Sequence, residues 1–116
     1  MRTKLISYVI YPFDLIVLFN VSYSEIETHL KKCLPEEVYP EIRFHFDREI
    51  KHGRTAMFTT GQTVIVLNNH DRGLMAHEIF HAVEFLFDRI GCKLSCKSSE
   101  AYAYLIQYIT NELYKK

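Results

Sequence analysis

Residues 71–90 decide the fold, and their sequence is DRGLMAHEIFHAVEFLFDRI. Apolar side chains recur along this stretch at spacings of three and four residues, which is the pattern of an α-helix. Asp71 can cap the first turn, and Gly91 follows at the position where helices prefer to end. Since apolar groups surround the helix almost completely, we expect a central helix that is buried on nearly all sides.

The segments before this helix predict a small sheet. Leu5–Tyr11 and Asp14–Asn20 are rich in Ile, Val, Leu and aromatic residues, and they predict two buried strands that are broken at Pro12. Thr55–Thr60 and Thr63–Asn68 flank a Gly-Gln pair and predict a β-hairpin. We therefore expect short strands on the N-terminal side of the long helix.

Three other stretches lie between these strands. Tyr23–Cys33 predicts a short surface helix that is capped by Ser22 or Ser24. Residues 35–40, which begin and end with proline, predict a loop. In residues 42–47, Ile and Phe alternate with polar residues, which predicts a half-buried strand.

After the long helix, a polar connection over residues 92–97 leads to a second helix, from Ser98 or Ser99 to about Tyr114. The 116 residues show no repeat, linker or second domain, so we expect a single domain over residues 1–116. Its predicted class is α+β: a small antiparallel or mixed sheet packed on two consecutive helices.

The composition excludes several classes of function. Fourteen basic side chains balance fourteen acidic ones, and this neutral balance argues against broad attraction to nucleic acid or to a membrane. Arg2 and Lys4 precede an apolar stretch, as in a signal peptide, but Pro12 and Asp14 interrupt it and no small-residue cleavage site follows. The stretch is also too short to span a bilayer. We therefore expect a cytoplasmic protein.

The long helix carries His77-Glu78-Ile79-Phe80-His81. Two histidines four residues apart lie on one side of a helix, one turn from each other, so both imidazoles can bind one metal ion. Glu78 projects beside them, where it can reach a metal-bound water without being a ligand. This is the HExxH motif of zinc hydrolases.

Eighteen residues separate His81 from Glu100, which opens the second helix as Glu100-Ala101-Tyr102-Ala103. In this spacing the chain resembles the gluzincin metallopeptidases, whose pattern is HExxH, eighteen residues and then ExxA. The chain is also similar to small zincin-like peptidases of bacteria and their phages. The resemblance implies that His77, His81 and Glu100 bind one zinc ion and that Glu78 is the general base. It also implies that Ala103 allows the two helices to lie close together.

The sequence departs from the gluzincin pattern in two places. Gluzincins often carry an acidic residue four positions after the glutamate ligand, where this chain has Tyr104. They also have a large C-terminal subdomain, whereas this chain ends sixteen residues after Glu100. We therefore expect a shallow site, or one that a second copy of the chain completes.

The expected activity is hydrolysis of a peptide bond in a peptide or protein substrate, with Glu78 taking the proton of the attacking water. Tyr104, Tyr108 and His70 are candidates for the donor that stabilises the oxyanion. Thr63–Asn68 either pairs with an extended peptide substrate or pairs only within its own sheet.

Two alternatives remain on the sequence alone. The first alternative is a non-catalytic zinc-binding module with an interaction or assembly role. The second is a zinc-dependent enzyme that hydrolyses another kind of bond. Glu84, one turn after His81, is either a partner of that histidine or a solvent-facing charge. The remaining histidines and two cysteines are interpreted as solvated side chains and free thiols: His29, His45, His52, Cys92 and Cys96.

Overall fold

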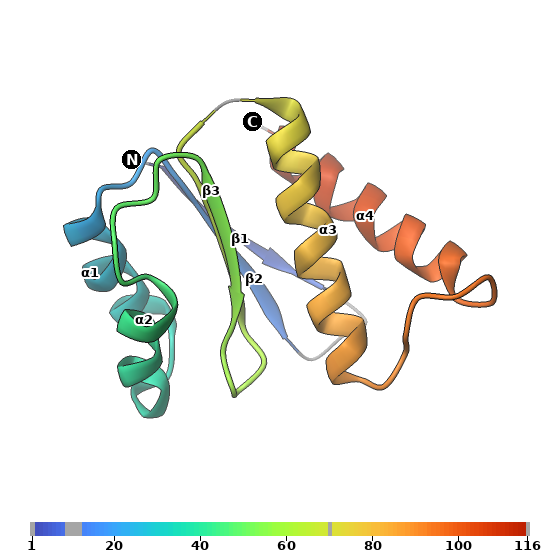
Figure 1. Cartoon of the computed structure of the whole chain (residues 1–116), viewed down its shortest axis with the longest axis horizontal. Helices are drawn as coiled ribbons and strands as arrows, with labels where there is room; N and C mark the ends of the chain where they lie inside the picture. The colour runs from blue at the N-terminus through green and yellow to red at the C-terminus, as the bar shows by residue number, and fades with distance from the viewer. Residues whose placement is uncertain (1, 9–12, 70, 116) are drawn as a thin grey trace.

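The computed structural model describes residues 2–8, 13–69 and 71–115 (Figure 1). Its elements, in chain order, are β1 (Arg2–Ser7), β2 (Asp14–Phe19), α1 (Tyr23–Cys33), the short 3₁₀ helix η1 (Glu36–Val38), α2 (Tyr39–His45), β3 (Gly53–Met57), β4 (Thr63–Leu67), α3 (Arg72–Arg89) and α4 (Ser99–Tyr114). This combination of a small mixed sheet and helices confirms the predicted α+β class.

The four strands form one sheet in the order β1-β2-β4-β3. β1 pairs with β2 in antiparallel fashion, β2 with β4 in parallel, and β4 with β3 in antiparallel fashion as the predicted hairpin. β4 therefore has a neighbour on each side, and Ile65 lies opposite both Val17 and Thr55. β1 and β3 form the two edges of the described sheet.

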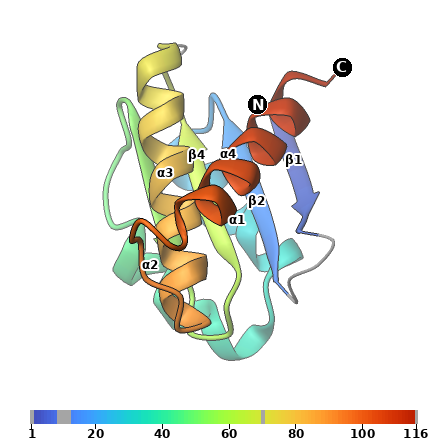
Figure 2. The same cartoon turned by 90° about the vertical axis from the view of Figure 1, so that its right-hand side faces the viewer.

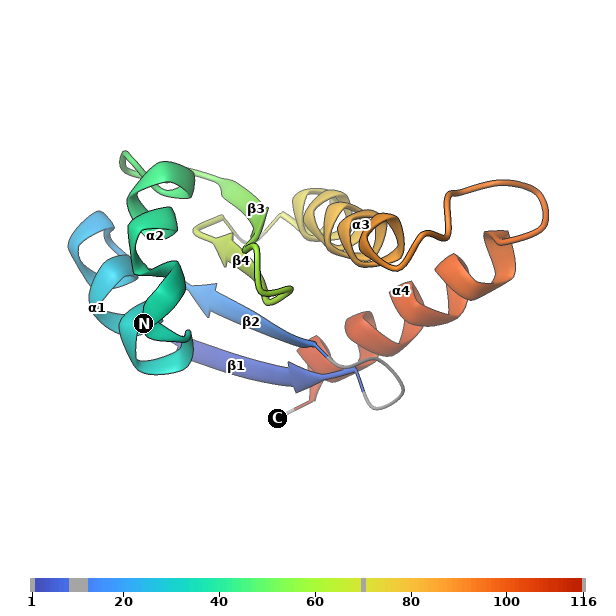
Figure 3. The ribbon, with the colours of Figure 1, turned by 90° about the horizontal axis from the view of Figure 1, so that it is seen from below.

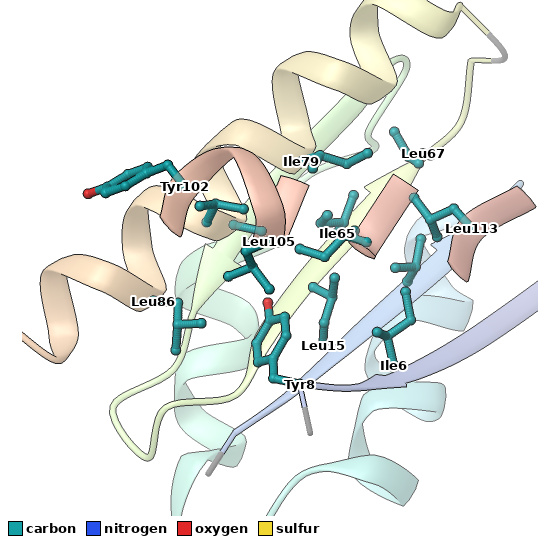
Figure 4. Close-up of a cluster of buried hydrophobic side chains, with 14 of the residues drawn as sticks. Ile6, Tyr8, Leu15, Ile65, Leu67, Ile79, Leu86, Tyr102, Leu105 and Leu113 are labelled. Atoms are coloured by element: carbon teal, nitrogen blue, oxygen red, sulfur yellow. The ribbon is translucent and has the colours of Figure 1, made fainter. Parts of the chain in front are cut away.

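Helices cover both faces of the sheet (Figures 2 and 3). Because successive side chains of a strand point to opposite faces, β2 and β4 supply two separate clusters of buried residues. Val17 and Ile65 belong to the cluster under α3 and α4, which Figure 4 shows in part. Ile16 and Val64 belong to the cluster under α1 and α2. The long helix thus packs on one side of a sheet that is buried on both.

Helix α3 confirms the predicted boundaries. The Asp71 carboxylate accepts a hydrogen bond from the backbone N–H of Gly73 at 2.8 Å, and Gly91 follows the helix with φ +81°. The expectation that α3 is buried on nearly all sides is wrong, because Ala76 and His77 are exposed. Among the described residues, α3 packs mainly on β3, β4 and α4. Its outer side, which carries His77, faces solvent.

The other predicted elements are confirmed with shifted ends. The first strand spans Arg2–Ser7, and residues 9–12 of the predicted strand and break lie outside the described residues. β3 begins and ends earlier than the predicted Thr55–Thr60. α1 and α4 match the predicted helices. No helix among the described residues is long and apolar enough to cross a membrane.

Residues 42–47 do not form the predicted strand. Helix α2 runs from Tyr39 to His45, with Pro40 in its first turn, and η1 precedes it where a loop was expected. Ile42 and Phe46 are buried, whereas Phe44 is 79% exposed. Residues four apart lie on one side of a helix, so the spacing of Ile42 and Phe46 suits this helix and the residue that follows it. Proline in a first turn favours the helix further.

Candidate metal centre

His77 and His81 lie one turn apart on the outer side of α3, and their side chains converge. Their Nε2 atoms are 3.1 Å apart, and the two rings are nearly perpendicular, with centroids 4.6 Å apart. Two nitrogen ligands of one tetrahedral zinc ion, each about 2.05 Å from the metal, would be about 3.3 Å apart. The observed distance is also that of an N–H···N hydrogen bond between two neutral imidazoles. The pair therefore fits as two ligands of one metal ion.

The ring of His81 is held by two neighbours on the same helix. Its Nδ1 atom lies 3.5 Å from Oε1 of Glu84, and the ring stacks on Phe85 with centroids 5.9 Å apart. A carboxylate at the second nitrogen of a metal-binding histidine fixes the orientation of the ring. Glu84 is itself half exposed, so it both faces solvent and contacts His81.

Glu78 points from α3 toward the sheet and is only 5% exposed. The hydroxyl of Thr55, on β3, donates a hydrogen bond to Oε1 of Glu78 at 2.6 Å and lies 3.2 Å from its backbone carbonyl oxygen. A carboxylate that is nearly removed from water needs such a partner, because burying it alone is costly. The candidate general base is thus fixed against the strand beside the histidines.

Gly53, two residues before Thr55, makes room for the same carboxylate. A Cβ atom at this position would lie 3.2 Å from Cγ of Glu78 and 3.2 Å from the carbonyl oxygen of Val66. Residues two apart on a strand share a face, so β3 presents a glycine and a threonine to Glu78. Neither residue was predicted to belong to the site, although glycine in a strand often marks such a close approach.

These side chains surround a shallow pocket of about 290 Å³ at the junction of α3 and β3. Its lining residues are Gly53, Arg54, Thr55, His77, Glu78, His81 and Phe85. The structure therefore brings together two of the predicted metal ligands and the predicted base, even though β3 and α3 lie far apart in the sequence.

Glu100 does not join them in this structure. It is exposed in the first turn of α4, and nowhere in residues 2–8, 13–69 and 71–115 do three His, Cys, Asp or Glu side chains gather as a metal site. The position of Tyr102 accounts for this placement. Its ring packs on Phe87, with centroids 4.5 Å apart, and its hydroxyl donates to the carbonyl of Cys92 at 3.0 Å. Tyr102, near the start of α4, therefore packs on the C-terminal half of α3, whereas His77 is in the N-terminal half.

The candidate oxyanion donors also lie elsewhere. Tyr104 is 67% exposed on α4. The hydroxyl of Tyr108 donates to the carbonyl of Ser7 at 2.7 Å, on β1, which is the sheet edge opposite β3. Neither tyrosine lines the pocket around the histidines. His70 lies outside the described residues.

One predicted role is overturned by the topology. Thr63–Asn68 was a candidate for pairing with a peptide substrate, but β4 lies between β2 and β3 and both of its sides are occupied. The edge strand next to α3 is β3. A peptide that extends this sheet near the histidines would therefore have to pair with β3.

Of the three histidines predicted to be solvated, His52 is exposed, whereas His29 and His45 are half-buried. His29 contacts Thr3, with Nε2 2.5 Å from Oγ1, and burial lowers the pKa of the half-buried His45 below its usual value. Cys92 and Cys96 are free thiols. None of them belongs to a metal-binding group among the residues that the structure describes.

Comparisons of the chain with models of protein families, with curated proteins and with solved structures find no match. The function proposed below therefore depends on the geometry of this site and on the spacing of its residues.

Proposed function

We propose that the protein is a zinc-dependent metallopeptidase whose metal is bound by His77 and His81 and whose general base is Glu78. The observation that supports this best is the convergence of the two Nε2 atoms, 3.1 Å apart, beside a buried carboxylate. Glu100 is the proposed third ligand because of the spacing that the chain shares with the gluzincins. A zinc ion with such ligands supplies a positive charge that makes a water molecule easier to deprotonate near neutral pH.

In this proposal Glu78 moves the proton. Thr55 donates to Oε1 of its carboxylate, which leaves Oε2 to accept a proton from the attacking water and to deliver it to the amine that leaves. Acid–base catalysis by one positioned side chain typically accelerates a reaction by about 10² to 10⁴. Glu84 and Phe85 hold the ring of His81, so the metal ligand and the base keep one relative orientation.

The free edge of β3 gives a peptide substrate a place to bind. At the two ends of the hairpin, the carbonyl of His52 accepts from Asn68 N at 2.6 Å, and Phe58 N donates to the carbonyl of Gln62 at 2.8 Å. Polar backbone groups alternate in direction along an antiparallel strand, so those of Gly53, Thr55 and Met57 point away from β4. An extended peptide that paired with them would lie next to the histidines, because two of these residues also line the pocket.

A second candidate function is a non-catalytic metal-binding module with an interaction or assembly role. The observation that favours it is the distance of Glu100 from the histidine pair, since a catalytic zinc site usually has three protein ligands. The two candidates differ in whether Glu78 is needed for the biological activity or only for the local structure.

Elemental analysis of protein purified without chelators measures bound zinc. Incubation with a broad peptide library measures cleavage. We expect about one zinc ion per chain in the wild type. His77→Ala should lose the zinc, and Glu100→Ala should bind it more weakly. Glu78→Gln should keep the zinc and lose cleavage, whereas Glu37→Gln, at an exposed acid outside the site, should keep both. Wild-type protein that binds no zinc even after zinc is added would overturn both candidates. Zinc binding with no cleavage would favour the module.

A further inference from the structure

A large hollow continues the histidine pocket along β3. It has a volume of about 790 Å³ and lies where β3 runs between α2 and α3 (Figure 1). Thr55 and Phe85 line both hollows. Sites of this size bind whole ligands of several groups rather than one side chain. The hollow can therefore hold several residues of a peptide that follows β3.

The walls of this groove are apolar and come from three elements. Phe44 of α2 is 79% exposed, Met57 belongs to β3, and Phe85 belongs to α3. A phenylalanine this exposed contributes nothing to the core beneath it, and exposed apolar surface of this kind often marks a contact site. Flat aromatic walls can pack against an apolar side chain. They can equally pack against the methylene stem of a lysine or arginine side chain.

The charges along the groove select between these two kinds of side chain. Glu41 and Asp88 both line it, and Arg89 is its one lysine or arginine among the described lining residues. The guanidinium of Arg89 lies 5.0 Å from the centroid of the Phe13 ring, so this cation already has a partner. Burial lowers the pKa of His45, which also lines the groove, and so favours its neutral form.

The two carboxylates differ in what they already contact. Glu41 accepts hydrogen bonds from Thr59, at 3.0 Å from its N–H and 2.6 Å from its hydroxyl, which fixes the charge without neutralising it. Asp88 forms no ion pair within the described residues, although Glu84 and Lys93 line the adjoining hollow with it. Asp88 is thus the acid that can pair with a cation from outside.

We propose that this groove binds an extended peptide segment that carries a lysine or arginine side chain. The stem of that side chain lies along Phe44, Met57 and Phe85, and its cationic end pairs with Asp88. The groove reaches Thr59, whereas the histidine pocket reaches Gly53. Glu78 contacts Thr55, and the groove extends to Thr59, four residues further along the chain. The basic residue therefore lies two to four residues from the bond that faces Glu78. This inference rests on the proposed peptidase function, since it assigns the substrate class of that site.

The test measures binding without turnover, using full-length Glu78→Gln protein. The probes are end-blocked octapeptides of alternating valine and threonine. Each peptide carries a single lysine, norleucine or glutamate, and this residue is moved through all positions in turn. Binding is measured by NMR titration. Norleucine has the stem of lysine without its charge. We expect the best lysine peptide to bind about two- to fivefold more tightly than its norleucine counterpart, as for a partly exposed ion pair. The glutamate peptide should bind more weakly than both.

Two variants in the same background locate the effect. Asp88→Asn should abolish the preference for lysine, while Glu37→Gln, at an exposed acid outside the groove, should preserve it. Phe44→Ala should weaken the binding of the lysine peptide and of the norleucine peptide to the same extent. Equal binding of lysine and norleucine peptides, a preference that survives Asp88→Asn, or no binding of any probe would overturn the proposal.

Cleavage by the wild-type protein separates this proposal from the proposed activity. Binding that depends on lysine and on Asp88, without cleavage of the same peptides, would support the groove and contradict the peptidase. Cleavage of peptides with no preference for a basic residue, unchanged in Asp88→Asn, would support the peptidase and overturn the groove.

Discussion

Glu78 is a charged residue inside an otherwise apolar interior, and Thr55 is the side chain that makes its position tolerable. Apart from Glu78, the only polar or charged residue buried to the same degree in the described structure is Thr63. The hydroxyl of Thr55, which precedes Glu78 by 23 residues in the sequence, donates to the Glu78 carboxylate. Gly53 leaves the space that the carboxylate occupies. These two residues of β3 set where the candidate base lies relative to the histidines.

We predict that Thr55→Val lowers the free energy of unfolding by about 1 to 3 kcal/mol at pH 7. Valine has nearly the shape of threonine but removes the hydrogen bond to Oε1 of Glu78, so it leaves a buried charge with one partner fewer. Urea unfolding measures the change. Thr55→Ser, which keeps the hydroxyl, should recover most of the stability, and Thr28→Val, at an exposed hydroxyl, should change it little. Equal stability of the serine and valine variants would contradict the prediction.

Tyr8 gives the stability a dependence on alkaline pH. Burial raises the pKa of its phenol well above the usual value of about 10. The unfolded chain therefore loses this proton near pH 10 while the folded chain keeps it, so the stability is complete below about pH 10 and falls as the pH rises further. We predict that the free energy of unfolding, measured in urea from pH 8 to 11.5, falls less steeply in Tyr8→Phe.

The control for this pH dependence is Tyr23→Phe, because Tyr23 is 42% exposed, whereas Tyr8 is buried. In this variant, the free energy of unfolding should fall with rising pH as steeply as it does in the wild type. If Tyr8→Phe and the wild type lost stability in parallel above pH 10, Tyr8 would not be the residue that links folding to alkaline pH.

Helix periodicity makes part of the site predictable from the sequence. His77 and His81 are four residues apart, so their convergence follows from the helix alone. Thr55 and Gly53 could not be predicted in this way, because their contact with Glu78 depends on how β3 packs against α3. The position of Glu100 in the structure also depends on tertiary packing, through Tyr102, which the number of residues between His81 and Glu100 does not determine.

At the scale of elements, α2 shows why a short segment is ambiguous. Ile42, Phe44 and Phe46 alternate as a strand would, but the same segment places Ile42 and Phe46 four apart, as a helix would. Phe44 decides between the two patterns, because it is exposed at the groove rather than buried with its neighbours. The long helices α3 and α4 had no such ambiguity, since their patterns extend over several turns.

Helix α3 carries the candidate site, and its first turn depends on one cap. The Asp71 carboxylate accepts from the N–H of Gly73, one of the donors that a helix start leaves without a partner. We predict that Asp71→Ala lowers the free energy of unfolding by about 1 kcal/mol. Asp71→Asn should retain most of the stability, because the amide oxygen can accept the same hydrogen bond.

Urea unfolding and amide exchange of Gly73 measure the loss of this cap. Asp47→Ala, at an exposed aspartate that caps no helix, is the matched control and should unfold like the wild type. A cap variant as stable as this control, with unchanged exchange at Gly73, would show that α3 does not depend on Asp71.

At the scale of the molecule, two buried clusters share the same central strands. The cluster under α3 and α4 takes Val17 and Ile65, and the cluster under α1 and α2 takes their neighbours Ile16 and Val64. A strand cannot leave one cluster without leaving the other. The two sides of the sheet should therefore unfold together, even though their helices make no common core.

We predict that a cavity on either side destabilises the whole protein in one transition. Ile109 in α4 and Ile26 in α1 are both fully buried. Replacing either by alanine should lower the free energy of unfolding by about 2 to 5 kcal/mol. Far-ultraviolet circular dichroism and hydrogen exchange on both sides of the sheet should give the same midpoint in urea. Ile90→Ala, at a residue that is 44% exposed, should cost less. If Ile26→Ala melted α1 and α2 while the site on α3 stayed folded, the sheet would not couple its two sides, and the candidate site would depend on one of them alone.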